Sequence, residues 1–302
     1  MKKILLTGVN GQVGHALSDQ LNQHEVIPLT RAQLDLTNLH DISRIVREIK
    51  PDLIINAAAY TAVDKAESEP ELCFAVNATA VGVLAEEAAR LNAGLIHFST
   101  DYVFNGEKQS PYLETDSVNA TNTYGKSKLA GEQAIAEVGL PHLILRTSWI
   151  YSTHGNNFLK SILRLAQEQD SLRVVCDQHG APTSSQCIAD GVVQLLNTWQ
   201  VDREDQAGIY HFTSTGVTTW HGFSREIISI YNDLQSQRKW PELKASIEKV
   251  VAVSSQEYPT PAIRPENSRL DNTKLKQVFN VELPSWQQGL QQIMQTLDTS
   301  LI

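Results

Sequence analysis

The chain has 302 residues, of which 41% are hydrophobic and 20% charged, an ordinary composition for a globular protein. This length suits one large domain or two closely joined domains. Lysine and arginine together number 25 and aspartate and glutamate 34, so the formal net charge is -9. An acidic chain argues against nonspecific binding to nucleic acid or anionic membranes, because both depend on basic patches.

We expect neither a secretion signal nor a membrane span. The apolar stretch after the first lysines is only Ile4-Leu5-Leu6, which is too short for the core of a signal peptide. No run reaches the ~18 apolar residues of a membrane helix. Cysteines occur three times, far apart and without C-x-x-C spacing, at Cys73, Cys176 and Cys187. The sequence therefore predicts free thiols, no zinc site and a reducing cytoplasmic setting.

Short apolar runs alternate with helical patterns through the first half of the chain. Buried strands are expected at Lys3–Thr7, Glu25–Leu29, Asp52–Asn56, Gly94–Ser99 and His142–Arg146. The helices between them are expected from the glycine-rich turn to Leu21, and at Asp41–Ile49, Pro70–Leu91 and Tyr124–Val138. Fully apolar strands separated by helices predict a parallel sheet covered on both faces, a Rossmann-type doubly wound α/β fold.

After about Trp149 this alternation loosens. Further helices are expected near Asn157–Gln169, Ser184–Leu196, Trp220–Ile230 and Ser285–Leu297, with short strands and Pro-rich turns between them. We predict a Rossmann domain over residues 1–150 and a smaller, mainly substrate-binding part over residues 151–302. Because no Gly/Ser linker separates them, the second part is expected to interleave with the first.

A glycine-rich turn lies between the first strand and the first helix. Thr7 to Gly14 reads TGVNGQVG, with G-x-x-G-x-x-G spacing instead of G-x-G-x-x-G. Glycines let the backbone approach a pyrophosphate, and the helix N-terminus points amides and a positive dipole at it. The residues predicted to bind the dinucleotide here are Gly8, Asn10, Gly11, Gln12, Val13 and Gly14. A tight turn that only packs helix on strand is the alternative.

Thr30 and Arg31 follow the second strand, where NAD-specific proteins carry an acidic residue that binds the ribose 2′-hydroxyl. A guanidinium suits a 2′-phosphate, so this pair favours NADPH, with NADH also usable. The alternative is an exposed surface arginine. Asp35 either holds the adenine edge or caps the next helix.

Tyr124 and Lys128 are four residues apart and lie on one face of a predicted helix. Reduction of a ketone needs a proton donor, and a phenol donates poorly near neutral pH unless a cation such as an ammonium lowers its pKa. Thr100 and Asp101 end the fourth strand, where Thr100 can bind a carbonyl oxygen and orient Tyr124. The alternatives are an exposed helical face for the first pair and a turn for the second.

Small residues end the third strand, where the sequence reads Asn56-Ala57-Ala58-Ala59. Ala58 is therefore expected to let a flat cofactor lie on the strand end, or to allow tight packing of helix on sheet, or both.

The motifs TGVNGQVG, NAAAYTAVD, STDYVF and YGKSK, in this order, resemble those of the extended short-chain dehydrogenase/reductase superfamily. More narrowly, STDYVF, RTSWIY, GNNF, DQHGAPT and TPAIRPENSRLD resemble the dTDP-4-dehydrorhamnose reductase family over nearly the whole chain. The resemblance implies reduction of the C4 ketone of dTDP-4-dehydro-L-rhamnose by NADPH or NADH, the last step of dTDP-L-rhamnose synthesis.

The resemblance also implies roles for individual residues. Tyr124 is the implied proton donor, Lys128 its partner, and Thr100 the carbonyl ligand. The implied cofactor contacts are Asn10, Gly11, Gln12, Asp35, Leu36, Ala59, Tyr60 and Thr61. The implied sugar contacts are Thr100, Asp101 and Trp149, whose indole can cover the apolar face of a sugar ring or pack in the core instead.

Some members of the family form a dimer bridged by magnesium through glutamates. The position expected to supply one of them holds Gln186, whose neutral amide is a poor ligand for a hard cation. We therefore predict no metal-bridged dimer, and a homodimer of another kind stays open. Two other functions also stay open: a different nucleotide-sugar reductase or epimerase, and a non-catalytic regulatory subunit of the methionine adenosyltransferase type.

Overall fold

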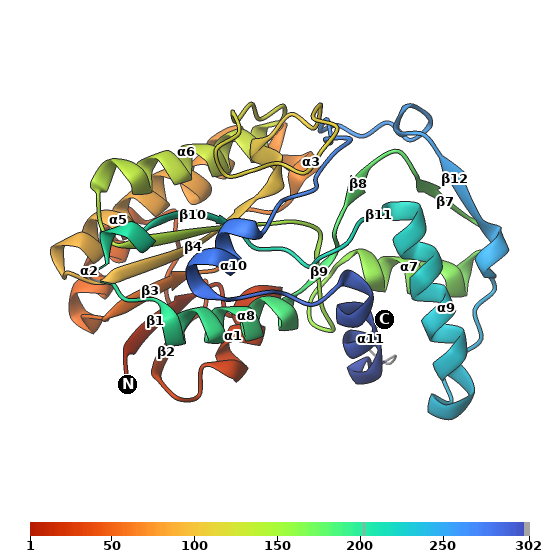
Figure 1. The fold of residues 1–302 in the computed structure, drawn as a ribbon, viewed down its shortest axis with the longest axis horizontal. Coiled ribbons are helices and arrows are strands. Elements are labelled where there is room, and N and C mark those ends of the chain that lie inside the picture. Colours follow the sequence, from red (N-terminus) through yellow and green to blue (C-terminus); the bar gives the residue numbers. More distant parts are fainter. Residues whose placement is uncertain (202, 299–302) are drawn as a thin grey trace.

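The computed structural model describes residues 1–201 and 203–298, and this part of the chain is built around a six-stranded parallel sheet (Figure 1). The strands are β1 (Lys3–Thr7), β2 (Glu25–Leu29), β3 (Leu53–Asn56), β4 (Gly94–Thr100), β5 (His142–Thr147) and β10 (Gly208–His211). Their order across the sheet is β10-β5-β4-β3-β1-β2, and every neighbouring pair is parallel. The predicted Rossmann-type fold is confirmed.

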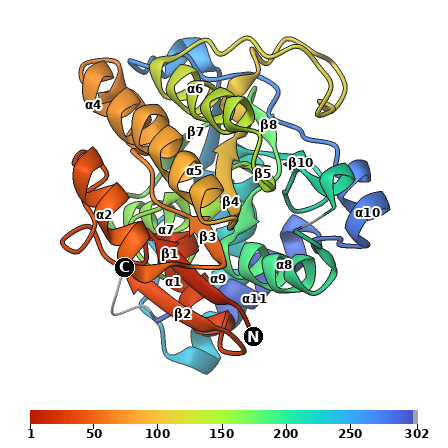
Figure 2. The same cartoon turned by 90° about the vertical axis from the view of Figure 1, so that its left-hand side faces the viewer.

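Helices cover both faces of this sheet (Figure 2). One face carries α1 (Gln12–Gln20), α8 (Ser185–Thr198) and α10 (Thr273–Phe279), whose apolar side chains share a core with those of the strands. The other face carries α2 (Leu39–Ile49), α5 (Ala80–Arg90) and α6 (Thr123–Val138). Strands that are buried on both faces in this way account for the continuous apolar runs in the sequence.

The helix predicted over Pro70–Leu91 is interrupted. It consists of α4 (Pro70–Phe74), a π-helical turn η1 (Ala75–Thr79) and α5, and the short α3 (Val63–Ala66) precedes it. Among the described residues, the run Pro70–Arg90 is long and apolar enough to cross a membrane, and 44% of its most apolar window is buried inside the protein. Its packing against α6 and the sheet is that of a core helix.

A second core lies beside the sheet, on the right of Figure 1. Its helices are α7 (Phe158–Glu168), α9 (Trp220–Arg238) and α11 (Trp286–Thr296), packed with the parallel pair β7 (Leu172–Val175) and β12 (Val250–Val253). Two smaller ladders pair β6 (Ile150–Tyr151) with β9 (Thr183–Ser184), and β8 (His179–Gly180) with β11 (Thr218–Thr219). Single turns of 3-10 helix are η2 (Asp101–Val103), η3 (Glu204–Gln206), η4 (Ile247–Lys249) and η5 (Ser255–Glu257).

The second half of the chain contributes to both cores. β10 pairs with β5 at the edge of the sheet, and α8 and α10 cover one face of it, although all three follow residue 150. The division into residues 1–150 and 151–302 thus remains a proposal about binding roles, and residues 299–302 lie outside the described part.

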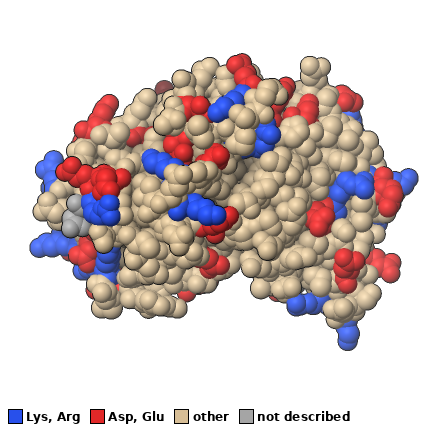
Figure 3. Space-filling view, in the orientation of Figure 1, with Lys and Arg blue, Asp and Glu red and all other residues tan. Residues whose placement is uncertain are grey.

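Most predicted bounds agree with the structure to within two residues, and α9 differs most. It continues to Arg238 instead of ending at Ile230, because Tyr231 is buried against Trp240 beyond the predicted end. On the face shown in Figure 3, acidic and basic side chains are interspersed.

Candidate active site

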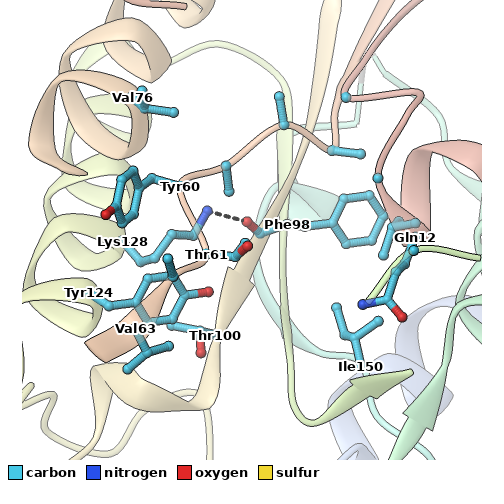
Figure 4. Close-up of a pocket in the computed structure, with 18 of the residues that line it drawn as sticks. Gln12, Tyr60, Thr61, Val63, Val76, Phe98, Thr100, Tyr124, Lys128 and Ile150 are labelled. Atoms are coloured by element: carbon cyan, nitrogen blue, oxygen red, sulfur yellow. Dashed lines mark hydrogen bonds between the residues drawn. The ribbon is translucent and has the colours of Figure 1, made fainter. Parts of the chain in front are cut away.

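A cleft of about 950 Å³ opens at the carboxyl ends of the strands. It brings together seventeen of the predicted site residues: Gly8, Asn10, Gly11, Gln12, Val13, Arg31, Asp35, Leu36, Ala58, Ala59, Tyr60, Thr61, Thr100, Asp101, Tyr124, Lys128 and Trp149. Figure 4 shows Tyr124, Lys128 and Thr100 on one side of the cleft, with Gln12 and Ile150 on the other. Two predicted residues, Gly14 and Thr30, do not line it.

The glycine-rich turn packs helix on strand, as the alternative interpretation of its sequence allowed. Gly8 has φ +72°, and a Cβ there would lie 2.6 Å from the backbone N of Ala58, so the turn packs directly on the end of β3. A Cβ on Gly14 would lie 2.2 Å from the carbonyl oxygen of Gly8. Gly14 therefore packs against the turn, and its predicted contact with a cofactor stays a prediction.

The start of α1 faces the cleft with its backbone amides. Gly11 is the N-cap residue, and among the described residues no side chain caps this end of the helix. Gly11, Gln12 and Val13 line the cleft, so the positive end of the helix dipole points into it. An anionic pyrophosphate fits this donor set.

Arg31 and Asp35 line the cleft beyond β2. Thr30 differs because its hydroxyl and backbone amide both bond to the Gln33 side chain at 2.9 Å, which turns it toward the loop. Asp35 accepts hydrogen bonds from the backbone and hydroxyl of Thr37, and these lower the pKa of its carboxyl group. Asn38 is the N-cap of α2, so the alternative that Asp35 caps this helix is wrong.

The π-helical turn positions the loop that follows β3. Asn77, within this turn, accepts a hydrogen bond from the backbone N–H of Tyr60 at 2.8 Å and donates one to the carbonyl of Tyr60 at 3.0 Å. The same amide donates to the hydroxyl of Ser127 on α6 at 3.0 Å. Inserting one residue into a helix aims this side chain at the cleft wall, a common use of π-turns at functional sites.

Thr100 and Asp101 form a buried pair at the end of β4. The Thr100 hydroxyl accepts from the backbone N–H of Tyr102 at 3.2 Å and donates to Asp101 at 3.0 Å. Thr100 thus caps the short η2 turn and also lines the cleft. Burial raises the pKa of the Asp101 carboxyl group to about 6.

Tyr124 extends from the first turn of α6 into the cleft. The Tyr124 side chain is partly exposed, and burial, followed by the charge of Asp101, raises the pKa of its hydroxyl. A hydrogen bond with Thr100 acts in the opposite direction. Tyr124 therefore holds its proton across the neutral range.

Lys128 lies one turn further along α6 and is 1% exposed. Its Nζ donates to the carbonyl oxygen of Phe98 at 2.6 Å (Figure 4) and lies 3.0 Å from Nε2 of His97. Burial lowers the pKa of Lys128 to about 8. The predicted lowering of the Tyr124 pKa is not seen in this structure, because burial outweighs any effect of a Lys128 that binds the β4 backbone.

Trp149 is not a core residue. Its backbone is left-handed, with φ 48°, and its half-buried ring lines the cleft. The ring stacks on Trp220 with centroids 3.7 Å apart and an angle of 11° between planes. Gly180 lies behind it, where a Cβ would come within 2.7 Å of the indole. Trp220 is held by a hydrogen bond from its Nε1 to the side chain of Gln178 at 3.1 Å.

We expect Trp220→Ala to abolish the coupled circular-dichroism band that two stacked indoles produce, because Trp149 then has no partner ring. Trp240→Phe is the matched control, since Trp240 packs on Tyr231 in the second core and not on Trp149. Retention of the coupled band in Trp220→Ala contradicts the stacked arrangement.

Within residues 1–201 and 203–298, no three His, Cys, Asp or Glu side chains form a group that could hold a metal ion. Gln186 donates a hydrogen bond to the Asp190 carboxylate at 2.8 Å. The absence of a metal-bridged dimer stays a prediction.

Several cleft residues carried no signal that sequence reasoning used. Trp220 comes from α9, far along the chain from Trp149. Asn156 and Asn157 also line the cleft, and the motif GNNF that contains them was noted without a role. Asn77 and His97 act on the cleft through other residues, which only the folded arrangement reveals.

The chain is similar to several known proteins over nearly its whole length. The family model described as RmlD substrate binding domain matches residues 1–299. A dTDP-4-dehydrorhamnose reductase of Burkholderia thailandensis is 45% identical, covering 94% of this chain and 95% of its own. The reductase of that name from Escherichia coli K12 is 42% identical over 98% of each chain. A crystal structure of dTDP-4-dehydrorhamnose reductase from Bacillus anthracis in complex with NADP has a TM-score of 0.88 and 34% identity, covering 98% of this chain and 99% of that one.

Proposed function

Because the chain belongs to the RmlD substrate-binding-domain family, we propose that it is an NADPH-preferring reductase of the C4 ketone of dTDP-4-dehydro-L-rhamnose. The product of this reaction is dTDP-L-rhamnose. The observation that carries the proposal is the meeting of Tyr124, Thr100 and the glycine-rich turn around one cleft. The three cysteines are free thiols, in keeping with a cytoplasmic enzyme.

A nicotinamide dinucleotide fits the donor set of this cleft. The amides at the start of α1 would hold its pyrophosphate, and the Arg31 guanidinium would pair with a 2′-phosphate. Asp35, Leu36 and the loop from Ala58 to Thr61 would contact the rest of the molecule. When bound, the cofactor supplies the hydride for the ketone carbon.

Tyr124 then supplies the proton. Its phenol remains protonated at neutral pH, so its Oη–H can donate to the oxygen of the reduced carbonyl. Thr100 orients this phenol, and turning its own O–H from Asp101 to the substrate would hold the carbonyl oxygen. Lys128 would place a positive charge behind the tyrosine whenever it is protonated. The stacked Trp149 would cover the apolar face of the sugar.

The direct test follows the absorbance of NADPH while dTDP-4-dehydro-L-rhamnose is generated in place by upstream enzymes. Substrate-dependent loss of absorbance, with dTDP-L-rhamnose as the product, is the expected result. If the protein binds NADPH but no sugar nucleotide causes it to oxidise the cofactor, the proposal is contradicted and a regulatory role is favoured.

We expect Arg31→Ala to lower the preference for NADPH over NADH by about tenfold, since a charge-assisted contact to phosphate contributes about 1.5 kcal/mol or more. The ratio of kcat/KM for the two cofactors measures the effect. Arg44→Ala is the control, because Arg44 is an exposed arginine on α2 that pairs with Asp41 and Glu48. An unchanged ratio in Arg31→Ala shows that Arg31 is only a surface residue.

A further inference from the structure

A row of buried polar side chains runs behind the cleft from Lys128 through His97 and Asn56 to Thr7. They are 1%, 0%, 1% and 2% exposed, respectively. Lys128 Nζ lies 3.0 Å from His97 Nε2, His97 Nδ1 lies 3.1 Å from Asn56 Nδ2, and the Thr7 hydroxyl donates to Asn56 Oδ1 at 2.7 Å. Four elements contribute one residue each: α6, β4, β3 and β1. The proposed reaction uses only the first of these side chains.

The groups around Oδ1 determine which way the Asn56 amide faces. The backbone N–H of Ala58 lies 3.3 Å from both Oδ1 and the Thr7 hydroxyl oxygen, and a backbone N–H can only donate. An NH₂ group in place of Oδ1 would face this N–H donor to donor, whereas an oxygen accepts from it and from the Thr7 hydroxyl. The NH₂ end of Asn56 therefore faces His97 and donates to Nδ1.

The tautomer of His97 follows from this donation. A neutral imidazole carries one N–H and one lone pair, so accepting at Nδ1 places the hydrogen on Nε2. Burial is the main cause that lowers the pKa of His97 well below its ordinary value, so His97 is neutral whether or not Lys128 carries a charge. Its Nε2–H then points at the nitrogen of Lys128.

An ammonium at Lys128 conflicts with this arrangement. Having donors only, it would oppose the Nε2–H of His97 in a site without solvent. Moving the hydrogen of His97 to Nδ1 relieves that contact but opposes the NH₂ of Asn56 instead. Every hydrogen bond in the row is satisfied only when Lys128 is an uncharged amine, which accepts from Nε2–H and donates to the carbonyl of Phe98.

We propose that the Asn56–His97 pair sets the upper pH limit of catalysis by favouring the uncharged amine of Lys128. In this role His97 is a positioning residue, and Lys128 exchanges a proton near neutral pH instead of being a permanent cation. The proposal rests on the proposed function for its catalytic part only, because the hydrogen-bond pattern is a property of the protein itself.

Other groups around Lys128 also act on its pKa. Burial is the main cause that lowers its pKa, to about 8. Two groups act in the opposite direction: Glu132 on α6, which is bonded to Arg146, and Cys73 on α4. His97 faces Lys128 from β4, and Tyr124 shares its helix. Removing the opposition between the Nε2–H of His97 and an ammonium at Lys128 should therefore raise the pKa of Lys128.

The first test measures the tautomer of His97 by nitrogen-15 NMR of histidine-labelled whole protein, without cofactor or substrate. His97→Gln identifies the signals among the nine histidines by their absence. We expect an acceptor-type Nδ1 and a hydrogen-bearing Nε2. A hydrogen on Nδ1 overturns the proposal even if the protein is an active reductase. The spectrum tests the proposal equally well if the protein reduces no sugar nucleotide.

The second test uses Asn56→Asp, whose carboxylate can still accept from Thr7 and Ala58. It can also accept from His97, which moves the imidazole hydrogen to Nδ1 and offers the Nε2 lone pair to an ammonium. We expect the alkaline limb of kcat/KM for NADPH, which reports the free enzyme, to move up by about one pH unit or more.

His97→Gln, with an amide oxygen for the ammonium, should move the limb in the same direction. Lys126→Met, on the exposed face of α6, should leave it in place. If Asn56→Asp and His97→Gln both fold and both leave the alkaline limb in place, the proposal is overturned. A purely structural role would lower activity without shifting the pH profile.

Discussion

Tyr124→Phe lowers the turnover number about 10²–10⁴-fold, the range typical of losing a general acid. The substitution removes only the hydroxyl, so the ring keeps its edge-to-face contact with Tyr102, with centroids 5.9 Å apart. Cofactor affinity should change little, because the amides of the glycine-rich turn are untouched. Initial rates and quenching of NADPH fluorescence on binding measure the two effects separately.

The neighbouring Tyr102→Phe is the matched control for this substitution. Tyr102 lines the same cleft and its ring touches Tyr124, but it has no role in the proposed proton transfer. Its loss should lower turnover less than tenfold. Near-normal turnover in Tyr124→Phe, or equal losses in the two variants, assigns the proton donor elsewhere.

Glu132→Ala destabilises the protein by about 3–5 kcal/mol, the cost of leaving a buried charge without its partner. Glu132 and Arg146 are 3% and 2% exposed and are joined by two hydrogen bonds, of 2.9 and 2.6 Å. Arg146 Nη1 already lacks a hydrogen-bond partner among the described residues, so the variant strands the whole guanidinium. Urea denaturation followed by circular dichroism measures the loss.

The double variant Glu132→Leu/Arg146→Met recovers much of this stability, since it removes both charges and keeps the volume apolar. A double-mutant cycle then isolates the interaction between the two side chains. If Glu132→Ala costs less than about 1 kcal/mol, as at an exposed ion pair, the pair is not buried in solution.

The parts of the fold that the sequence predicted are those with a local signal. Continuous apolar runs identified β1, β3 and β4 because strands buried on both faces need no polar side. Tyr124 and Lys128 were found from spacing within one helix, and Gly8 and Gly11 from a turn with a strand before it and a helix after it.

The missed features depend on contacts between distant residues. Nothing near Trp149 in the sequence shows that Trp220 lies against it, and the Ala-rich run gives no sign that Asn77 sits in a π-turn. The spacing of Gly14 fits a cofactor glycine, but only the fold shows that a Cβ there would meet the backbone of Gly8. The hydrogen bond from Thr30 to Gln33, which holds Thr30 outside the cleft, is likewise not visible in the sequence.

The position of β10 has a consequence for synthesis of the chain on the ribosome. Until residues 208–211 have emerged, β5 is an open edge with unpaired backbone groups, and the α1 face of the sheet lacks α8 and α10. Open strand edges and bare apolar faces are sites of aggregation in nascent chains. The Rossmann half therefore completes its folding only after most of the protein has been made, and a fragment ending near residue 150 should need a chaperone to stay soluble.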